Sequence, residues 1–167
     1  MNFIPVNSLE LDLAFNASSV DSFTGPLDEA TIHRLTSPDP WHEDLRNWIQ
    51  AVRISPLLTC PNVVRFTSSV SMGLQLTDDK TIADLNAYWR CKQEKTDVLS
   101  FPALDKHIVL PADICVELGD VIVSVPTAQC QAKEHSHSLE TELRWLVVHG
   151  LLHLLGWDHP NSKGLSD

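Results

Sequence analysis

The segment HGLLHLLGWDH near the C-terminus restricts the local fold more than any other part of the chain. It holds His149 and His153 four residues apart, then Gly156, then His159. On an α-helix, residues four apart lie on one side, so both imidazoles point the same way. Glycine adopts positive φ at no steric cost and often ends a helix. The spacing therefore predicts a helix that ends near Gly156, after which the chain doubles back and brings His159 to the other two.

Three imidazoles that converge in this way form a candidate metal site. Neutral imidazole nitrogens at roughly 2.0–2.1 Å suit Zn²⁺, and three protein ligands leave a fourth position for water. The sequence therefore predicts one zinc ion per chain, bound by His149, His153 and His159. The remaining histidines lack such partners and are predicted to be surface residues: His33, His42, His107, His135 and His137.

The chemistry of this site is open at the level of the residues. The spacing matches the HExxHxxGxxH pattern of metzincin metalloproteases, but Gly150 stands where those enzymes have their general base. Asp158 is a candidate to orient an imidazole or help activate water, and is equally well explained as a turn residue. Another zinc hydrolase remains an alternative. So does a non-catalytic factor with a structural metal, although structural zinc sites usually have four protein ligands.

Length and charge limit the architecture and the partners. The 167 residues predict a single domain over 1–167, with an N-terminal strand and long loop over 1–40, a catalytic core over 41–159 and a short tail over 160–167. The scattered cysteines and the absence of signal-peptide or membrane-spanning patterns predict a cytoplasmic protein. A formal net charge of −10 opposes non-specific binding to phosphate backbones, so a nucleic-acid substrate requires a local basic group or a partner.

Hydrophobic patterning predicts an α+β fold, because strands and helices are mixed without strict alternation. Strands are expected over 9–15, over 63–76 as one strand or a bent pair, over 98–101 and over 121–125. Helices are expected after Asp39, over 82–89, over 126–135 and after Ser138. Asp39 and Ser138 are the expected caps, and Glu142 is expected in a first turn, where the helix dipole favours negative charge. Loops are expected over 16–40, with at most a short helix, and over 102–119.

The histidine segment resembles the signature of the YbeY family of bacterial and organellar metal-dependent endoribonucleases. Three further segments match that family in the same order: LTDDKTIADLNAYWR over 76–90, TDVLSFP over 96–102 and LGDVIVS over 118–124. The resemblance covers residues 63–159 and is weaker at the N-terminal strand and the helix after Trp41. It implies a small mixed β-sheet flanked by helices, with zinc at the end of a cleft.

The resemblance also implies a function and roles for particular residues. Family members are implicated in maturing the 3′ end of 16S ribosomal RNA and in ribosome quality control, so a zinc-dependent, single-strand-specific endoribonuclease is expected, cytoplasmic or organellar. The implied metal ligands are His149, His153 and His159. The implied catalytic set is His149, Arg90, which matches the phosphate-binding arginine of LNxxYR, and Asp120, the acidic residue of LGD. Expected partners are ribosomal RNA and the ribosome, its small-subunit proteins or an assembly GTPase, with no membrane.

Overall fold

The computed structural model describes residues 9–17, 27–90, 96–104 and 114–157. Its elements in chain order are β1 (Glu10–Asn16), α1 (Glu29–Thr36), α2 (Asp39–Ile54), α3 (Asn62–Arg65), β2 (Ser69–Thr77), α4 (Asp79–Arg90), β3 (Val98–Pro102), β4 (Val116–Ser124), α5 (Val125–Glu134) and α6 (Leu139–Leu154). None of the helices within these ranges is both long and apolar enough to cross a membrane.

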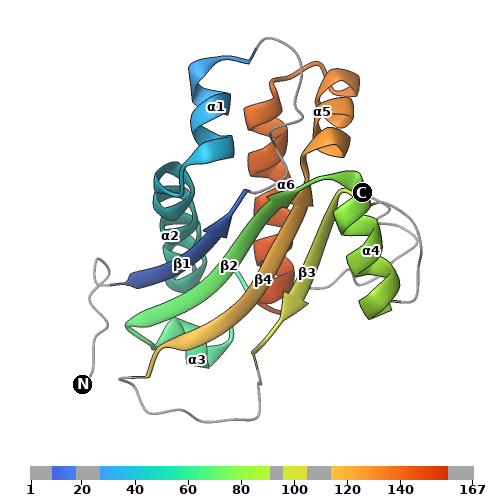
Figure 1. Cartoon of the computed structure of the whole chain (residues 1–167). Helices are drawn as coiled ribbons and strands as arrows, with labels where there is room; N and C mark the ends of the chain where they lie inside the picture. Colours follow the sequence, from blue (N-terminus) through green and yellow to red (C-terminus); the bar gives the residue numbers. More distant parts are fainter. Residues whose placement is uncertain (1–8, 18–26, 91–95, 105–113, 158–167) are drawn as a thin grey trace.

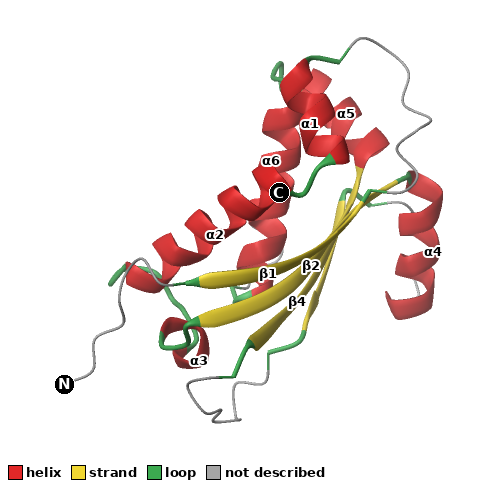
Figure 2. Ribbon diagram, turned by 60° about the vertical axis from the view of Figure 1, so that its left-hand side comes forward, coloured by secondary structure: helices red, strands yellow, loops and turns green. Residues whose placement is uncertain are grey.

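The strands form one mixed sheet in the order β1-β2-β4-β3. β1, β2 and β4 run parallel to one another, and the edge strand β3 runs antiparallel to β4. Figures 1 and 2 show α2 and α6 on one face of this sheet and α4 on the other. The expected mixed sheet flanked by helices is therefore confirmed.

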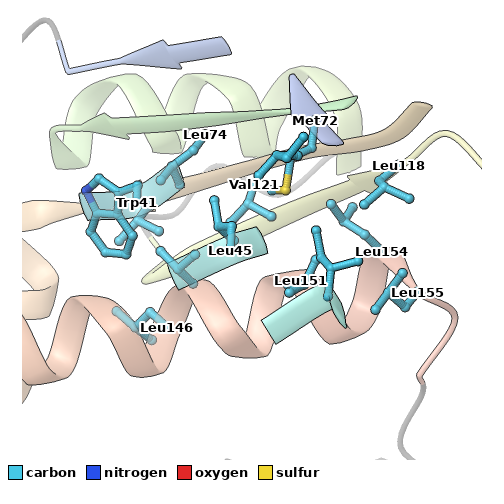
Figure 3. Packing of buried hydrophobic residues seen from close by; sticks show 14 of the residues in the cluster. Trp41, Leu45, Met72, Leu74, Leu118, Val121, Leu146, Leu151, Leu154 and Leu155 are labelled. Atoms are coloured by element: carbon cyan, nitrogen blue, oxygen red, sulfur yellow. The ribbon is translucent and has the colours of Figure 1, made fainter. Parts of the chain in front are cut away.

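Two groups of buried side chains hold the layers together. The larger one lies between the sheet and helices α2 and α6, and is drawn in Figure 3 with Trp41, Leu45, Met72, Leu74, Leu118, Val121, Leu146, Leu151, Leu154 and Leu155. The smaller one lies under α4 and consists of Ile82, Leu99 and Ile122. Successive residues of a strand face opposite sides, so Val121 and Ile122 of β4 enter different cores. Each face of β4 is thus covered by a different helix.

An irregularity in β4 determines which residues reach each face. Gly119 has φ +126°, and the pairing between β2 and β4 shifts register at Ser71 and Met72. An extra residue of this kind is a β-bulge, which re-aims the side chains that follow it. Leu118 and Val121 therefore both face α6, while Asp120 faces α4.

Several local expectations need correction. Residues 63–65, expected in a strand, lie in the short helix α3, since the Pro61 carbonyl accepts the N–H groups of Val64 at 3.0 Å and Arg65 at 2.9 Å. β4 begins at Val116 rather than at Val121, within the expected loop. Asp39 is the first residue of α2 and not its cap. β2 begins only at Ser69, and Val125, expected at the end of a strand, is the first residue of α5. The other expected elements within the described ranges are confirmed to within a few residues, and the single-domain boundaries stay a prediction.

Candidate metal centre

The C-terminal end of α6 has the backbone geometry that the histidine spacing predicts. Gly156 has φ +94°, and its N–H donates to the His153 carbonyl at 3.1 Å. The Trp157 N–H donates to the Leu152 carbonyl at 2.9 Å. These two bonds satisfy carbonyls of the last turn and form a Schellman motif, in which the chain leaves the helix sharply. The predicted helix end at Gly156 is confirmed.

The structure brings two of the three predicted ligands together. The Nε2 atoms of His149 and His153 lie 3.1 Å apart. Two nitrogens on one tetrahedral zinc, each at roughly 2.0–2.1 Å, are about 3.4 Å apart. The pair therefore fits a shared metal ion with a small adjustment of the rings. His159 and Asp158 lie outside the described residues, so the third ligand stays a prediction.

The two histidines line a cavity of about 420 Å³ together with residues of β3 and of the turn after α6. Asp97 is the acidic residue of this lining, and its carboxylate accepts the Val98 N–H at 2.8 Å and the Gln131 side-chain amide at 3.2 Å. These bonds fix the carboxylate in the cavity wall. Sequence reasoning missed Asp97 as a site residue, although it belongs to the matched segment TDVLSFP.

The environment of Gly150 explains why no glutamate follows the first histidine. A Cβ atom at this position would lie 2.7 Å from Val121 Cγ1 and 3.2 Å from Ser100 Oγ. Ser100 Oγ also donates to the Gly150 carbonyl at 3.2 Å. Position 150 thus packs directly against strands β3 and β4 of the sheet. A glutamate side chain has no room there, which removes the general base of a metzincin on steric grounds.

Asp120 is not beside the histidines. It faces α4 and lines a separate cavity of about 890 Å³ on the other side of the sheet. Partial burial, and secondly the negative charge of Glu117, raise the pKa of the Asp120 carboxyl. Pro102, at the end of edge strand β3, lines both cavities. Arg90 is the last residue of α4, and its side chain lies outside the described part of the chain.

A second histidine group occupies the other end of α6. His135 Nδ1 lies 3.0 Å and His137 Nε2 lies 2.5 Å from Glu142 Oε1, and the Glu142 side chain is only 1% exposed. The two imidazoles are exposed, as predicted, but their shared carboxylate partner was missed. Across the described ranges, these three residues form a group whose donor atoms lie within 4.8 Å of one another, close enough to hold a metal ion. Ser136, between the histidines, has φ +58°.

Comparison with known proteins extends the sequence resemblance. The family model described as Endoribonuclease YbeY matches residues 39–166. An Endoribonuclease YbeY from Prochlorococcus marinus (strain MIT 9313) is 60% identical over 161 residues, which cover 96% of this chain and 86% of that protein. The counterpart from Synechococcus sp. (strain CC9311) is 49% identical over 158 residues, covering 95% of this chain and 89% of that protein.

A solved structure shares the fold at low sequence identity. The solution structure of TM1509 from Thermotoga maritima is 22% identical and aligns with a TM-score of 0.51, covering 91% of this chain and 78% of that chain. The family match spans most of the chain, and the high-identity relatives span nearly all of it. The chain therefore belongs to the Endoribonuclease YbeY family.

Proposed function

We propose that this protein is a zinc-dependent endoribonuclease that cleaves single-stranded RNA. The proposal rests on the family to which the chain belongs and on one structural observation, the 3.1 Å separation of the His149 and His153 Nε2 atoms in an accessible cavity. His159, which follows three residues after the Gly156 turn, is the proposed third ligand. Three neutral imidazoles form a donor set suited to Zn²⁺ and leave a position open for water.

The chain's own groups supply the remaining parts of a hydrolytic site. Zinc held by His149, His153 and His159 would supply a water of lowered pKa and polarisation of a phosphoryl oxygen. The fixed Asp97 carboxylate lines the same cavity and is the proposed acceptor for a proton of the attacking water. Arg90 is proposed to hold the scissile phosphodiester through its planar set of donors. Substituting Arg90→Ala is expected to retain zinc and lose RNA turnover.

The proposed biological substrate is ribosomal RNA. By family resemblance the reaction is maturation of the 16S 3′ end, with a further part in ribosome quality control, in the cytoplasm or an organelle. With a net charge of −10, the chain is repelled by RNA at long range. A small-subunit protein or an assembly GTPase that holds the chain on the ribosome would overcome this repulsion.

The decisive experiment measures metal and cleavage together. We expect about one zinc per purified chain, as the three-ligand site requires, and cleavage of single-stranded RNA that a chelator abolishes. His153→Ala should lose both zinc and cleavage, while His33→Ala, an exposed histidine of α1, should keep both. Unaltered zinc and activity in His153→Ala would reject the three-histidine site. Bound zinc without cleavage of any RNA would instead favour the structural-metal alternative.

A further inference from the structure

The cavity under α4 has no part in the proposed metal chemistry. Its volume of about 890 Å³ falls within the 300–1,000 Å³ typical of ligand sites. It is lined by strands β1, β2, β4 and β3 and by helix α4, so every strand of the sheet contributes to it. A hollow of this size can accommodate a small ligand.

One cross-strand row of residues forms the floor. Ala14 pairs with Gly73, Gly73 with Asp120, and Asp120 with Phe101. A Cβ atom at Gly73 would lie 2.2 Å from Asp120 Oδ1, so the carboxylate lies across the glycine. The absence of a side chain at Gly73 therefore leaves the space that the Asp120 carboxylate occupies over the cavity floor.

Polar and aromatic groups surround this carboxylate. The next row of the sheet places the Asn16 and Gln75 amides in the lining. Trp89 of α4 forms part of the wall, with its ring centroid 6.0 Å from that of Phe101 and its side chain 61% exposed. Exposed aromatic rings beside hydrogen-bonding groups are how proteins bind unpaired bases of RNA, with stacking on the ring and recognition of the base edge.

The charge of the cavity selects the base rather than the phosphate. Asp120 lines it and Glu117 lies on the same strand, so a phosphate group would be repelled. A carboxylate accepts hydrogen bonds through both oxygens. Among the four bases, guanine alone presents two adjacent donors, N1–H and the N2 amino group, on its Watson–Crick edge. Amide groups such as those of Asn16 and Gln75 can donate to its O6 acceptor.

We propose that this cavity binds one unpaired guanine base of the RNA substrate, stacked on Trp89 and hydrogen-bonded through its N1 and N2 donors to Asp120. The inference deepens the proposed endoribonuclease function and rests on it. Because Pro102 lines both cavities, a strand passing around the edge of β3 places its neighbouring phosphates at the histidine cavity. Asp120 is then a residue that selects the cleavage site and not one that performs the chemistry.

The test measures binding of uncleavable RNA to the zinc-loaded protein. We would use fluorescein-labelled 2′-O-methyl hexauridine carrying one guanosine, inosine or adenosine, and determine the Kd by fluorescence anisotropy. Inosine lacks the N2 amino group, so the guanosine oligonucleotide should bind about tenfold more tightly than the inosine one, as expected for one lost base-edge contact. Adenosine, which lacks the N1 donor as well, should bind no better than inosine.

Three variants separate the parts of the site. Asp120→Asn should abolish the preference for guanosine over inosine while leaving zinc content unchanged. The matched control Glu117→Gln removes the same charge from the same strand outside the cavity and should keep the preference. Trp89→Leu, at an exposed position, should weaken binding of all three oligonucleotides about tenfold through lost stacking and preserve their ratio.

Two results would overturn the guanine site: equal affinity of the wild-type protein for the three oligonucleotides, or an unchanged preference in Asp120→Asn. Neither result would affect the nuclease proposal, which is tested separately by zinc content and RNA cleavage. A guanosine preference without any cleavage would support the base site and reject the nuclease.

Discussion

The two ends of helix α6 each gather two histidines, and they do so for different physical reasons. At the C-terminal end, His149 and His153 direct their Nε2 atoms toward each other across 3.1 Å. At the N-terminal end, His135 and His137 both contact Glu142, whose side chain is almost completely buried. A buried carboxylate is costly unless hydrogen bonds satisfy it. Two neighbouring histidines therefore do not by themselves identify a metal site, because a carboxylate that both of them contact can account for their proximity.

The largest expected difference between the two ends is in zinc affinity. His149→Ala should weaken zinc binding more than about 100-fold, because it removes a proposed direct ligand. His137→Ala should leave zinc affinity unchanged, because its imidazole serves Glu142. Competition with a chromophoric chelator measures both. Loss of a zinc ion in His137→Ala would show that the N-terminal group is itself a metal site and would break the distinction.

For the free energy of unfolding, the larger effect is expected at the N-terminal end of α6. Glu142→Ala should lower the free energy of unfolding by about 2 kcal/mol, the loss expected for buried hydrogen bonds to a charged group. Urea unfolding with a chelator present measures this without a contribution from metal. Glu43→Ala, at an exposed position of α2, should stay within about 0.5 kcal/mol of the wild type. An unchanged free energy of unfolding in Glu142→Ala would mean that the Glu142 carboxylate does not stabilise the fold.

Each end of α6 also has one residue with a left-handed backbone conformation, Gly156 after the helix and Ser136 before it. Gly156→Ala should cost about 1 kcal/mol, because alanine is strained at φ +94°. It should also reduce zinc affinity, since this turn sets the direction in which the chain leaves α6 before His159, the proposed third ligand. Thermal unfolding and zinc titration report the two effects separately. A variant with unchanged zinc affinity would show that this turn does not position His159.

The smallest expected effect has the opposite sign. Ser136→Gly should stabilise the protein by about 0.5 kcal/mol, since glycine adopts φ +58° without the steric cost that serine bears. Zinc affinity should not change, because this residue serves only the N-terminal histidines. Urea denaturation of Ser136→Gly and Gly156→Ala side by side provides the matched comparison. Destabilisation by Ser136→Gly would contradict the view that serine is strained at this position.

Features that depend on a few neighbouring residues could be predicted from the sequence. Ser138 caps α6 by accepting the Thr141 N–H at 3.1 Å, and Gly156 ends that helix, as the local patterns indicate. The four-residue spacing of His149 and His153 was sufficient to place their imidazoles together, because helix geometry fixes it.

Features that depend on distant partners could not be predicted in this way. Val63 and Val64 favour a strand by residue type, yet the chain turns at Pro61, and Arg65 donates to the Leu58 carbonyl at 3.2 Å. Glu142 follows the pattern of an exposed first-turn residue, and only the fold buries it beneath His137. Strand alternation gives no sign of which face α6 covers, so nothing in the sequence separates Asp120 from the histidines.

The anchoring of Trp157 has a consequence for how firmly His159, the proposed third ligand, would be held. Its indole N–H donates to the Thr59 carbonyl at 2.9 Å, which fixes the point where the segment carrying His159 begins. Consecutive Cα atoms are about 3.8 Å apart, so the Cα of His159 is tethered within about 7.6 Å of this fixed residue. So short a tether would give the imidazole of His159, if it is the third ligand as proposed, a high effective concentration at the paired nitrogens and a small loop-closure entropy. Free imidazole in solution should therefore compete poorly for this coordination position, and metal should leave the protein slowly.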